Sequence, residues 1–200
     1  MSAQYNEQEI IVKFFGNKRN GSLVEIGAAD GIDNSHTYFL CVDRGWSAIL
    51  VEPHPTFFQA LHDLYINYEK VLCVQAGILS DKSRAILYMN GQISRFLSSA
   101  NDILNFKRSK GFEGELEVEC VTLNELFESL CVPYDLDFLS IDAEGTDMDV
   151  LNSLNWDKWK PQLICVEHSM PRYALDHFMS GKGYALYEAN IGNSFYAIKK

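Results

Sequence analysis

A glycine-bracketed turn between two short apolar strands constrains the fold of this chain more than any other feature. Residues 22–26 have the pattern of a buried strand, and the turn that follows them is Gly27-Ala-Ala-Asp-Gly31. A helical stretch comes next, and a second apolar strand at 47–52 ends on Glu52. A parallel α/β sheet that binds a nucleoside at the carboxyl ends of its strands has this order of strand, tight turn, helix, strand and acid. The order therefore predicts an α/β fold with a nucleoside site at those strand ends.

The spacing of the glycines indicates which kind of cofactor the turn would accept. Dinucleotide-binding turns read G-x-G-x-x-G, whereas this turn reads E-x-G-x-x-x-G, with Ala28 and Ala29 following the first glycine. Small residues let the backbone approach a ligand closely, and Glu52 can accept hydrogen bonds from two ribose hydroxyls. An NAD(P)-linked oxidoreductase that uses the same crevice is an alternative, which the glycine spacing disfavours.

Composition limits the classes to which the chain can belong. Its 200 residues, 47% of them apolar, suffice for one domain over 1–200 with a single core. No apolar run approaches the ~20 residues of a membrane span, and the first residues do not resemble an export signal. Five scattered cysteines without a C-x-x-C pair favour reduced thiols in a cytoplasmic protein. A formal net charge of −10 disfavours nucleic acid and membrane surfaces as partners. The sequence does not indicate an oligomeric state.

Strands and helices alternate along the chain, which predicts a mostly parallel sheet with helices on both faces. The last two predicted strands are joined by too few residues for a crossover helix, so they must be antiparallel. Segments 85–89 and 116–121 are either an extra strand or an edge hairpin. Residues 90–114, rich in Gly, Ser, Asn and charge, form the only lid-like segment and would cover the substrate. The seven predicted strands of the sheet are 22–26, 47–52, 71–75, 137–141, 162–166, 183–187 and 194–198.

The first half of the chain provides candidate cofactor contacts at the strand ends. A helix predicted from about Ser35 would present free backbone N–H groups that suit a ligand carboxylate. The segment after the third strand could reach an adenine edge. Asp30 and Asn34 could instead be ordinary turn residues, and Glu52 could simply end its strand before Pro53. The candidate contacts are Glu25, Gly27, Gly31, Ser35, Thr37, Glu52 and Ala76.

The second half of the chain places more acids at the same edge of the sheet. Asp142 and Glu144 follow one strand, and Glu167 and His168 end the next. Such an acidic pocket suits a cationic ligand electrostatically. Asp142 and Glu144 could instead only cap the following helix, and His168 could be hydrogen-bonded locally. The other histidines and the three tryptophans have structural interpretations by default.

In these segments the chain resembles the FkbM-type methyltransferases, a family of S-adenosylmethionine (SAM)-dependent O-methyltransferases. The segment Ile141-Asp-Ala-Glu-Gly145 and the Glu52-Pro53 pair carry most of the resemblance, which extends in order over residues 22–198. The chain departs from the family pattern at Ser140, where Lys is common, and at Asp147, where Glu is common. The other matching pieces are 24–31, 35–37, 39–40, 45–46, 50–51, Pro55, 137–139, 150–151, 166–167 and 183–184.

The resemblance implies a Rossmann-like class I methyltransferase fold that ends in an antiparallel hairpin. It also implies methyl transfer from SAM to a hydroxyl of a small molecule or glycan, with SAM contacts at Glu25, Gly27, Ser35 or Thr37, Glu52 and Asp142. A SAM-binding module without turnover is a second alternative to this enzyme.

Three residues are candidates for the chemical step. Asp142, Glu167 and His168 lie nearest to where a general base would act, or they could hold Mg²⁺ or Mn²⁺. Aligning the two reactants can supply roughly 7–11 kcal/mol, whereas a general base typically gives 10²–10⁴-fold. The hypothesis of an enzyme therefore does not depend on an obvious base.

Overall fold

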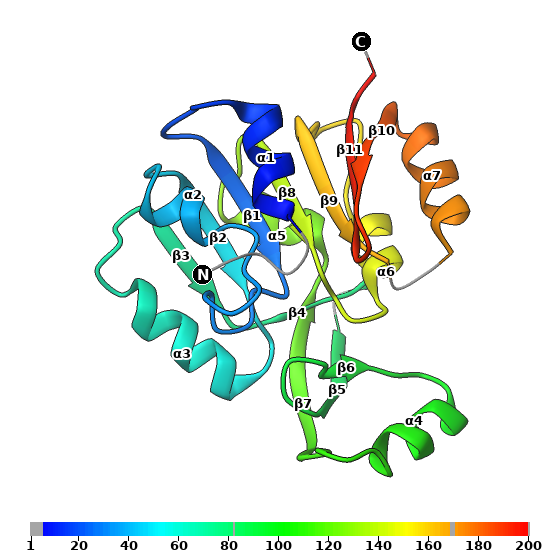
Figure 1. The fold of residues 1–200 in the computed structure, drawn as a ribbon. Helices are drawn as coiled ribbons and strands as arrows, with labels where there is room; N and C mark the ends of the chain where they lie inside the picture. Colours follow the sequence, from blue (N-terminus) through cyan, green and yellow to red (C-terminus); the bar gives the residue numbers. More distant parts are fainter. Residues whose placement is uncertain (1–5, 82, 169–170, 200) are drawn as a thin grey trace.

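Two β-sheets form the framework of the computed structural model, which describes residues 6–81, 83–168 and 171–199 (Figure 1). The larger sheet has seven strands in the order β3-β2-β1-β8-β9-β11-β10. All neighbouring strands pair in parallel except β11, which is antiparallel to both β9 and β10. Its strands are β1 (Ser22–Ile26), β2 (Ser47–Val51), β3 (Val71–Val74), β8 (Phe138–Ile141), β9 (Leu163–Glu167), β10 (Tyr184–Ala189) and β11 (Asn193–Ile198). The predicted sheet and its antiparallel end are confirmed.

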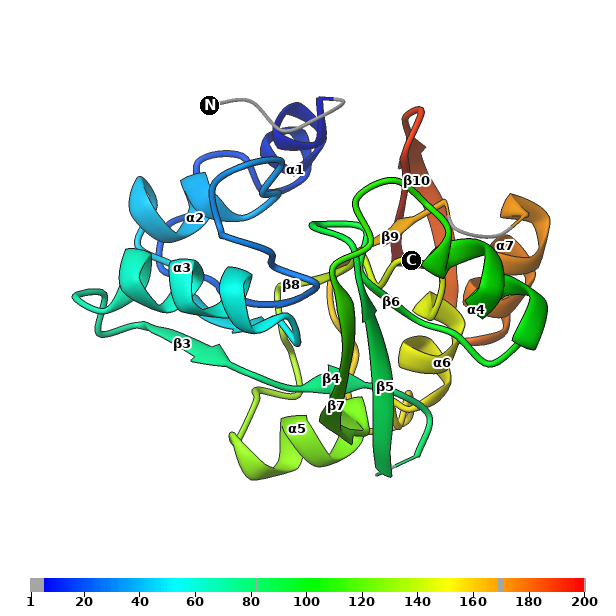
Figure 2. The same cartoon turned by 90° about the horizontal axis from the view of Figure 1, so that it is seen from below.

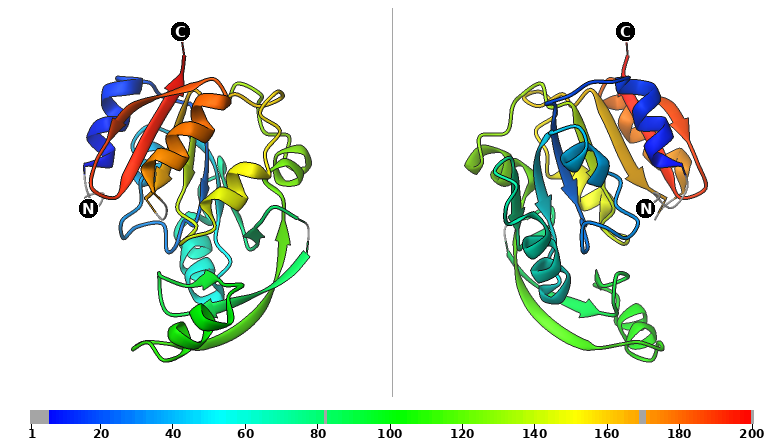
Figure 3. Two further views of the ribbon diagram at one scale, coloured as in Figure 1. Left: turned by 90° about the vertical axis from the view of Figure 1, so that its right-hand side faces the viewer. Right: turned by 60° about the vertical axis from the view of Figure 1, so that its left-hand side comes forward.

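Helices cover both faces of this sheet because its central strands β1, β2, β8 and β9 are apolar on both sides. In β1, Leu23 packs with the first group of helices and Val24 with the second, since successive side chains of a strand point to opposite faces. Figure 3 shows α1 and α7 on opposite sides of the sheet. The first group is α1 (Glu7–Phe15), α2 (Tyr38–Val42) and α3 (Pro55–Tyr65); the second is α5 (Leu123–Ser129), α6 (Asp147–Asn152) and α7 (Arg172–Gly181). In the described part of the chain, no helix has the length and apolarity of a membrane span.

The helix that follows the glycine turn is shorter than predicted. α2 begins at Tyr38 rather than near Ser35 and contains only five residues. The Ser35 hydroxyl accepts hydrogen bonds from the N–H groups of Thr37 and Tyr38, so residues 35–37 form a polar turn that leads into the helix. The predicted helix start near Ser35 is therefore wrong, while the binding of a ligand carboxylate by residues 35–37 stays a prediction.

The spacings Thr56-x-x-Gln59 and Thr146-x-x-Asp149 predict caps that the structure does not form, whereas a third predicted cap is present. His54 caps α3, because its ring Nδ1 accepts the N–H of Thr56 at 3.2 Å. Thr146 precedes α6 but makes no side-chain cap. At α5, by contrast, Thr122 and Glu125 form the reciprocal capping box that their spacing predicts.

A second sheet of four strands lies beyond the carboxyl ends of the large one, at the bottom of Figure 1 and towards the viewer in Figure 2. Its order is β4-β7-β5-β6, and β5 pairs antiparallel with β7 from Ser83 opposite Cys120 to Met89 opposite Gly114. Segments 85–89 and 116–121 thus form a hairpin-like pair in a separate sheet, not an edge of the large one. The elements are β4 (Gly77–Ile78), β5 (Ser83–Met89), β6 (Arg95–Phe96), α4 (Ala100–Lys107) and β7 (Gly114–Val121). The predicted lid, 90–114, contains β6 and α4.

Candidate active site

A cavity of about 330 Å³ lies between the two sheets, at the carboxyl ends of β1, β2, β8 and β9. The large sheet supplies one wall. The turn between β5 and β6 (residues 90–94, here called the β5–β6 turn) supplies much of the other through Gly91, Gln92, Ile93 and Ser94. Of the residues predicted from the sequence, the cavity is lined by Glu25, Gly27, Ser35, Glu52, Ala76, Asp142 and Glu167.

Gly27 is fixed by the close approach of β8. Its φ is +81°, and a Cβ atom there would lie 1.8 Å from the carbonyl oxygen of Asp142. The N–H groups of Gly27 and Ala28 both donate to the carbonyl of Val51, at 2.9 and 3.0 Å. The turn is therefore joined to β2 on one side and crowded by β8 on the other. Only glycine fits this position without a shift of the backbone.

Gly31 has a different role from the one predicted. It also has a positive φ (+77°), but a Cβ atom there would meet Leu61 at 2.6 Å and Tyr65 at 3.0 Å. These side chains belong to α3, and Gly31 does not line the cavity. The second glycine of the motif thus allows the turn to pack on a helix. Asp30 behaves as an ordinary turn residue, because its carboxylate accepts the N–H groups of Ile32 and Asp33.

Glu25 is a buried carboxyl on the cavity wall. The Thr37 hydroxyl donates to its Oε2 at 2.6 Å. Burial raises the pKa of Glu25 to about 7, against the opposing effect of the hydrogen bonds from Thr37 and the His36 backbone. Thr37 itself is fully buried and does not line the cavity. It therefore orients Glu25 from behind the cavity wall.

Glu52 lies on the same wall, just after the neighbouring strand β2, and is held there by two backbone N–H groups. Ala29 donates to Oε2 at 2.9 Å and His54 donates to Oε1 at 2.7 Å. Burial raises the pKa of Glu52 to about 7, while these two bonds act in the opposite direction. Each carboxylate oxygen keeps a free lone pair, so Glu52 could accept two further hydrogen bonds from a ligand.

Asp142, Glu144 and Glu167 bring three carboxyl groups together beside this wall. One oxygen from each lies within 4.8 Å of the others. Burial, followed by the charge of Glu167, raises the pKa of Asp142 well above its usual range. Burial also raises the pKa of Glu144, to about 7. Oδ1 of Asp142 is buried and has no hydrogen-bond partner among the described residues. The group is therefore suited to hold a proton, a cation or a ligand hydroxyl.

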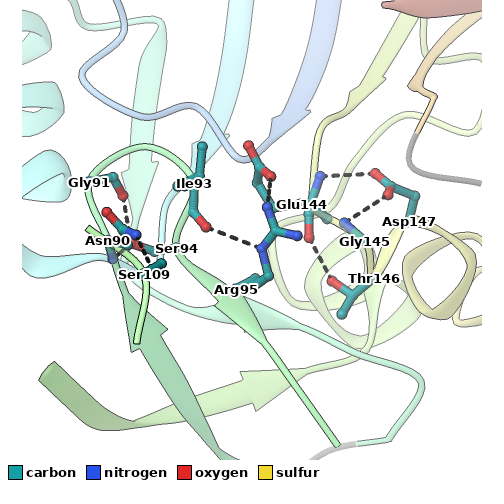
Figure 4. Close-up of polar contacts among 11 residues, drawn as sticks. Asn90, Gly91, Ile93, Ser94, Arg95, Ser109, Glu144, Gly145, Thr146 and Asp147 are labelled. Atoms are coloured by element: carbon teal, nitrogen blue, oxygen red, sulfur yellow. Dashed lines mark hydrogen bonds and ion pairs between the residues drawn. The ribbon is translucent and has the colours of Figure 1, made fainter. Parts of the chain in front are cut away.

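Two residues that shape this acidic group lay outside the predicted site. Arg95 of β6 donates to Glu144 Oε2 at 2.7 Å and to the Ile93 carbonyl at 3.3 Å (Figure 4). Asp147 accepts the N–H groups of Ala143 and Gly145, which closes the loop after β8. In the sequence, Arg95 appeared only as part of the lid. Asp147 appeared only as an acid near a helix start, and only its departure from the family pattern marked it.

The structure places two histidines differently from the prediction. His168 does not line the cavity: its ring contacts the Ile191 carbonyl at 3.2 Å and the Ser194 hydroxyl at 2.7 Å. The structure therefore does not bring it to Asp142 and Glu167 as a base or metal ligand. His36, expected to be structural, is buried at the cavity wall with Nδ1 3.0 Å from the Ser140 hydroxyl. Burial lowers the pKa of His36, which favours the neutral form of this imidazole.

Comparison with known proteins gives the family. The sequence profile described as "Methyltransferase FkbM domain" matches residues 25–186, which include both walls of the cavity. The chain belongs to the FkbM methyltransferase family. This chain is accordingly an enzyme of the SAM-dependent methyltransferase class, and the nicotinamide alternative is set aside. No curated protein sequence matches it significantly.

Solved structures of methyltransferases share the fold at low sequence identity. FkbM from Methylobacillus flagellatus KT is 11% identical with a TM-score of 0.56, over 90% of this chain but only 44% of that one. The precorrin-6y C5,15-methyltransferase of Geobacter metallireducens is 12% identical with a TM-score of 0.51, over 96% and 87%. The fibrillarin pre-rRNA processing protein of Methanococcus jannaschii is also 12% identical with a TM-score of 0.51, over 96% and 75%. This chain spans less than half the length of the Methylobacillus protein.

Proposed function

We propose that this enzyme transfers the methyl group of SAM to a hydroxyl of a small-molecule or glycan acceptor, with both reactants in the cavity between the two sheets. The observation that carries the proposal is the pairing of Gly27 with Glu52 across one cavity wall. Gly27 leaves no room for a side chain, and Glu52 is fixed by two N–H groups with lone pairs to spare.

The cofactor would occupy the half of the cavity formed by β1, β2 and the residues after β3. Glu52 accepts the two ribose hydroxyls, and Ala76 lies against the adenine edge. Glu25 carries a negative charge once a cation displaces its proton, so it suits the ammonium of the methionine part. Ser35 lines the same half of the cavity. Gly31 and Thr37 support this surface from behind it.

The acceptor would lie between the three carboxyl groups and the β5–β6 turn. Methyl transfer is a displacement in line with the leaving sulfur, so most of the rate can come from alignment of the two reactants. Asp142 and Glu167 are the residues that can take the proton of the acceptor hydroxyl. Burial raises the pKa of both groups, so each binds a proton more readily than an ordinary carboxyl does.

A divalent cation is a second candidate occupant of the acidic group. Three carboxylate oxygens within 4.8 Å of one another are a donor set that fits Mg²⁺ or Mn²⁺. The ligands would be Asp142, Glu144 and Glu167, and not His168. A bound cation would lower the pKa of the acceptor hydroxyl. Titration calorimetry with MgCl₂ and MnCl₂ tests this directly, and Glu144→Gln should abolish any heat.

A transfer assay tests the proposed reaction. Methyl-labelled SAM is incubated with the enzyme and a panel of hydroxylated acceptors matched to amine and thiol analogues. We expect label on the hydroxyl oxygen of the acceptor. The Asp142→Asn variant should lose this activity, whereas Glu188→Gln, which changes an acid of β10 outside the cavity, should keep it. Label on nitrogen or sulfur alone would contradict O-methylation, and SAM binding without turnover on any acceptor would favour the binding-module alternative.

A further inference from the structure

Glu113 lies just before β7 and is not one of the residues that line the cavity. Its side chain nevertheless connects the large sheet with the β5–β6 turn. Its Oε2 is 3.2 Å from Nε2 of His54, and its Oε1 accepts the N–H of Gly91 at 3.0 Å. His54 is buried on the side of the large sheet, and Gly91 belongs to the β5–β6 turn. One half-exposed carboxylate therefore joins the two sheets at the cavity.

The bridge continues to Glu52 through a chain of hydrogen bonds. The ring Nδ1 of His54 accepts the N–H of Thr56, so the ring carries its proton on Nε2 and donates it to Glu113. The backbone N–H of the same histidine donates to Glu52 at 2.7 Å. Four consecutive groups are thus linked: Glu52, His54, Glu113 and Gly91.

Hydrogen bonds and an ion pair hold the β5–β6 turn at both ends. The Ser94 hydroxyl accepts the N–H of Asn90 and contacts the Gly91 carbonyl, which closes the turn on itself. At the far end, Arg95 pairs with Glu144 on the loop after β8 (Figure 4). Gln92 and Ile93, which line the cavity, lie between these two attachments. A displacement at either end would move this wall of the cavity.

We propose that Glu113 is a positioning residue that ties the acceptor wall to the cofactor site, so that cofactor bound at Glu52 fixes the β5–β6 turn for the acceptor. The inference rests on the proposed function for the role of Glu52 and adds the coupling between the two halves. Such coupling is reciprocal: whatever steadies the turn also strengthens cofactor binding. Removing Glu113 leaves the N–H of Gly91 and the ring of His54 without their partner.

Hydrogen exchange with and without S-adenosylhomocysteine (SAH) tests the proposal in the wild type, Glu113→Ala and Glu113→Gln. The control is Glu117→Ala, a similarly exposed glutamate of β7 whose ion pair, within the described part of the chain, is with Arg84. We expect SAH to slow exchange at 90–96 in the wild type and the control, and much less in Glu113→Ala. The Kd for SAH should rise about 3- to 10-fold in Glu113→Ala, the size expected for one lost hydrogen bond, and less in Glu113→Gln.

Each outcome decides one question. Equal protection of 90–96 by SAH in the wild type and in both Glu113 variants, with equal Kd values, would overturn the inference. Absence of SAH protection at 90–96 in a wild type that binds SAH would also overturn it. If the wild type does not bind SAH at all, the proposed function fails first. Glu113→Gln, which keeps one acceptor oxygen, covers the case in which Glu113→Ala does not fold.

Discussion

Single residues in this site are constrained by what surrounds them more than by the motif they belong to. Gly27 and Gly31 look equivalent in the sequence, yet one is crowded by the backbone of β8 and the other by side chains of α3. Glu25 and Glu52 were predictable, because an acid at the end of an apolar strand has little structural reason to be there. The link from Glu52 to Glu113 could not be predicted, because its members are far apart in the chain and no local sequence pattern joins them.

Replacing Gly27 by alanine should destabilise the protein strongly. The new Cβ would lie 1.8 Å from the Asp142 carbonyl oxygen, and the positive φ adds strain. We expect a loss of at least about 3 kcal/mol in the free energy of unfolding. Gly181→Ala is the matched control, since a Cβ atom there meets nothing within 4 Å and the position is helical. Urea unfolding of both variants measures the difference; equal stabilities would contradict the packing described for the turn.

Glu52→Gln should weaken SAM binding without unfolding the protein. The amide keeps the shape of the side chain but replaces one acceptor oxygen with a donor, next to the N–H of Ala29 or His54. Loss of a charge-assisted hydrogen bond of about 1.5–3 kcal/mol corresponds to roughly 10- to 100-fold in Kd. Titration calorimetry with SAM gives the affinity, and thermal unfolding checks the fold. An unchanged Kd would remove the ribose role from Glu52.

At the scale of elements, the order of strands and helices in the large sheet followed from hydrophobic patterning and connection lengths. The short link after 183–187 required an antiparallel partner, and β10 and β11 pair in that way. The small sheet was not predictable as a separate unit, because a paired hairpin can join a sheet edge or stand apart with the same local sequence. Its place depends on contacts such as Arg95 with Glu144.

Arg95→Gln should uncouple the small sheet from the acidic group. The ion pair with Glu144 is partly buried, so its loss leaves a carboxyl whose pKa rises further. We expect the turnover number to fall about 10-fold or more, with the Kd for SAM within about twofold of wild type. Arg84→Gln is the control, because its partners Glu117 and Glu119 are exposed on the same sheet. Equal losses in both variants would indicate a general effect on the small sheet instead.

For the whole molecule, burial of acids at one edge makes the empty protein sensitive to pH. Glu25 and Glu52 each have a pKa of about 7 in the folded state against an ordinary 4.5. The folded state therefore holds protons that the unfolded chain releases above about pH 4.5. Stability should fall as pH rises from about 4.5 to 7, by up to about 3 kcal/mol per carboxyl.

Urea unfolding of the SAM-free protein between pH 5 and 8 measures this slope. Glu25→Gln should reduce the slope of stability against pH, since an amide does not titrate while Glu52 still does. Glu188→Gln on β10 should leave the slope unchanged. Stability that rises with pH over this range would contradict the burial of these acids. The same arrangement explains why a cationic cofactor suits the site, because it favours the charged forms that burial disfavours.

A crystal structure of the enzyme with SAH tests the central claim most directly. We expect density in the cavity between the two sheets, with both ribose hydroxyls on Glu52, the backbone of Gly27 against the ligand and the adenine edge beside Ala76. SAH bound elsewhere, or a cavity without SAH at saturating concentration, would contradict it.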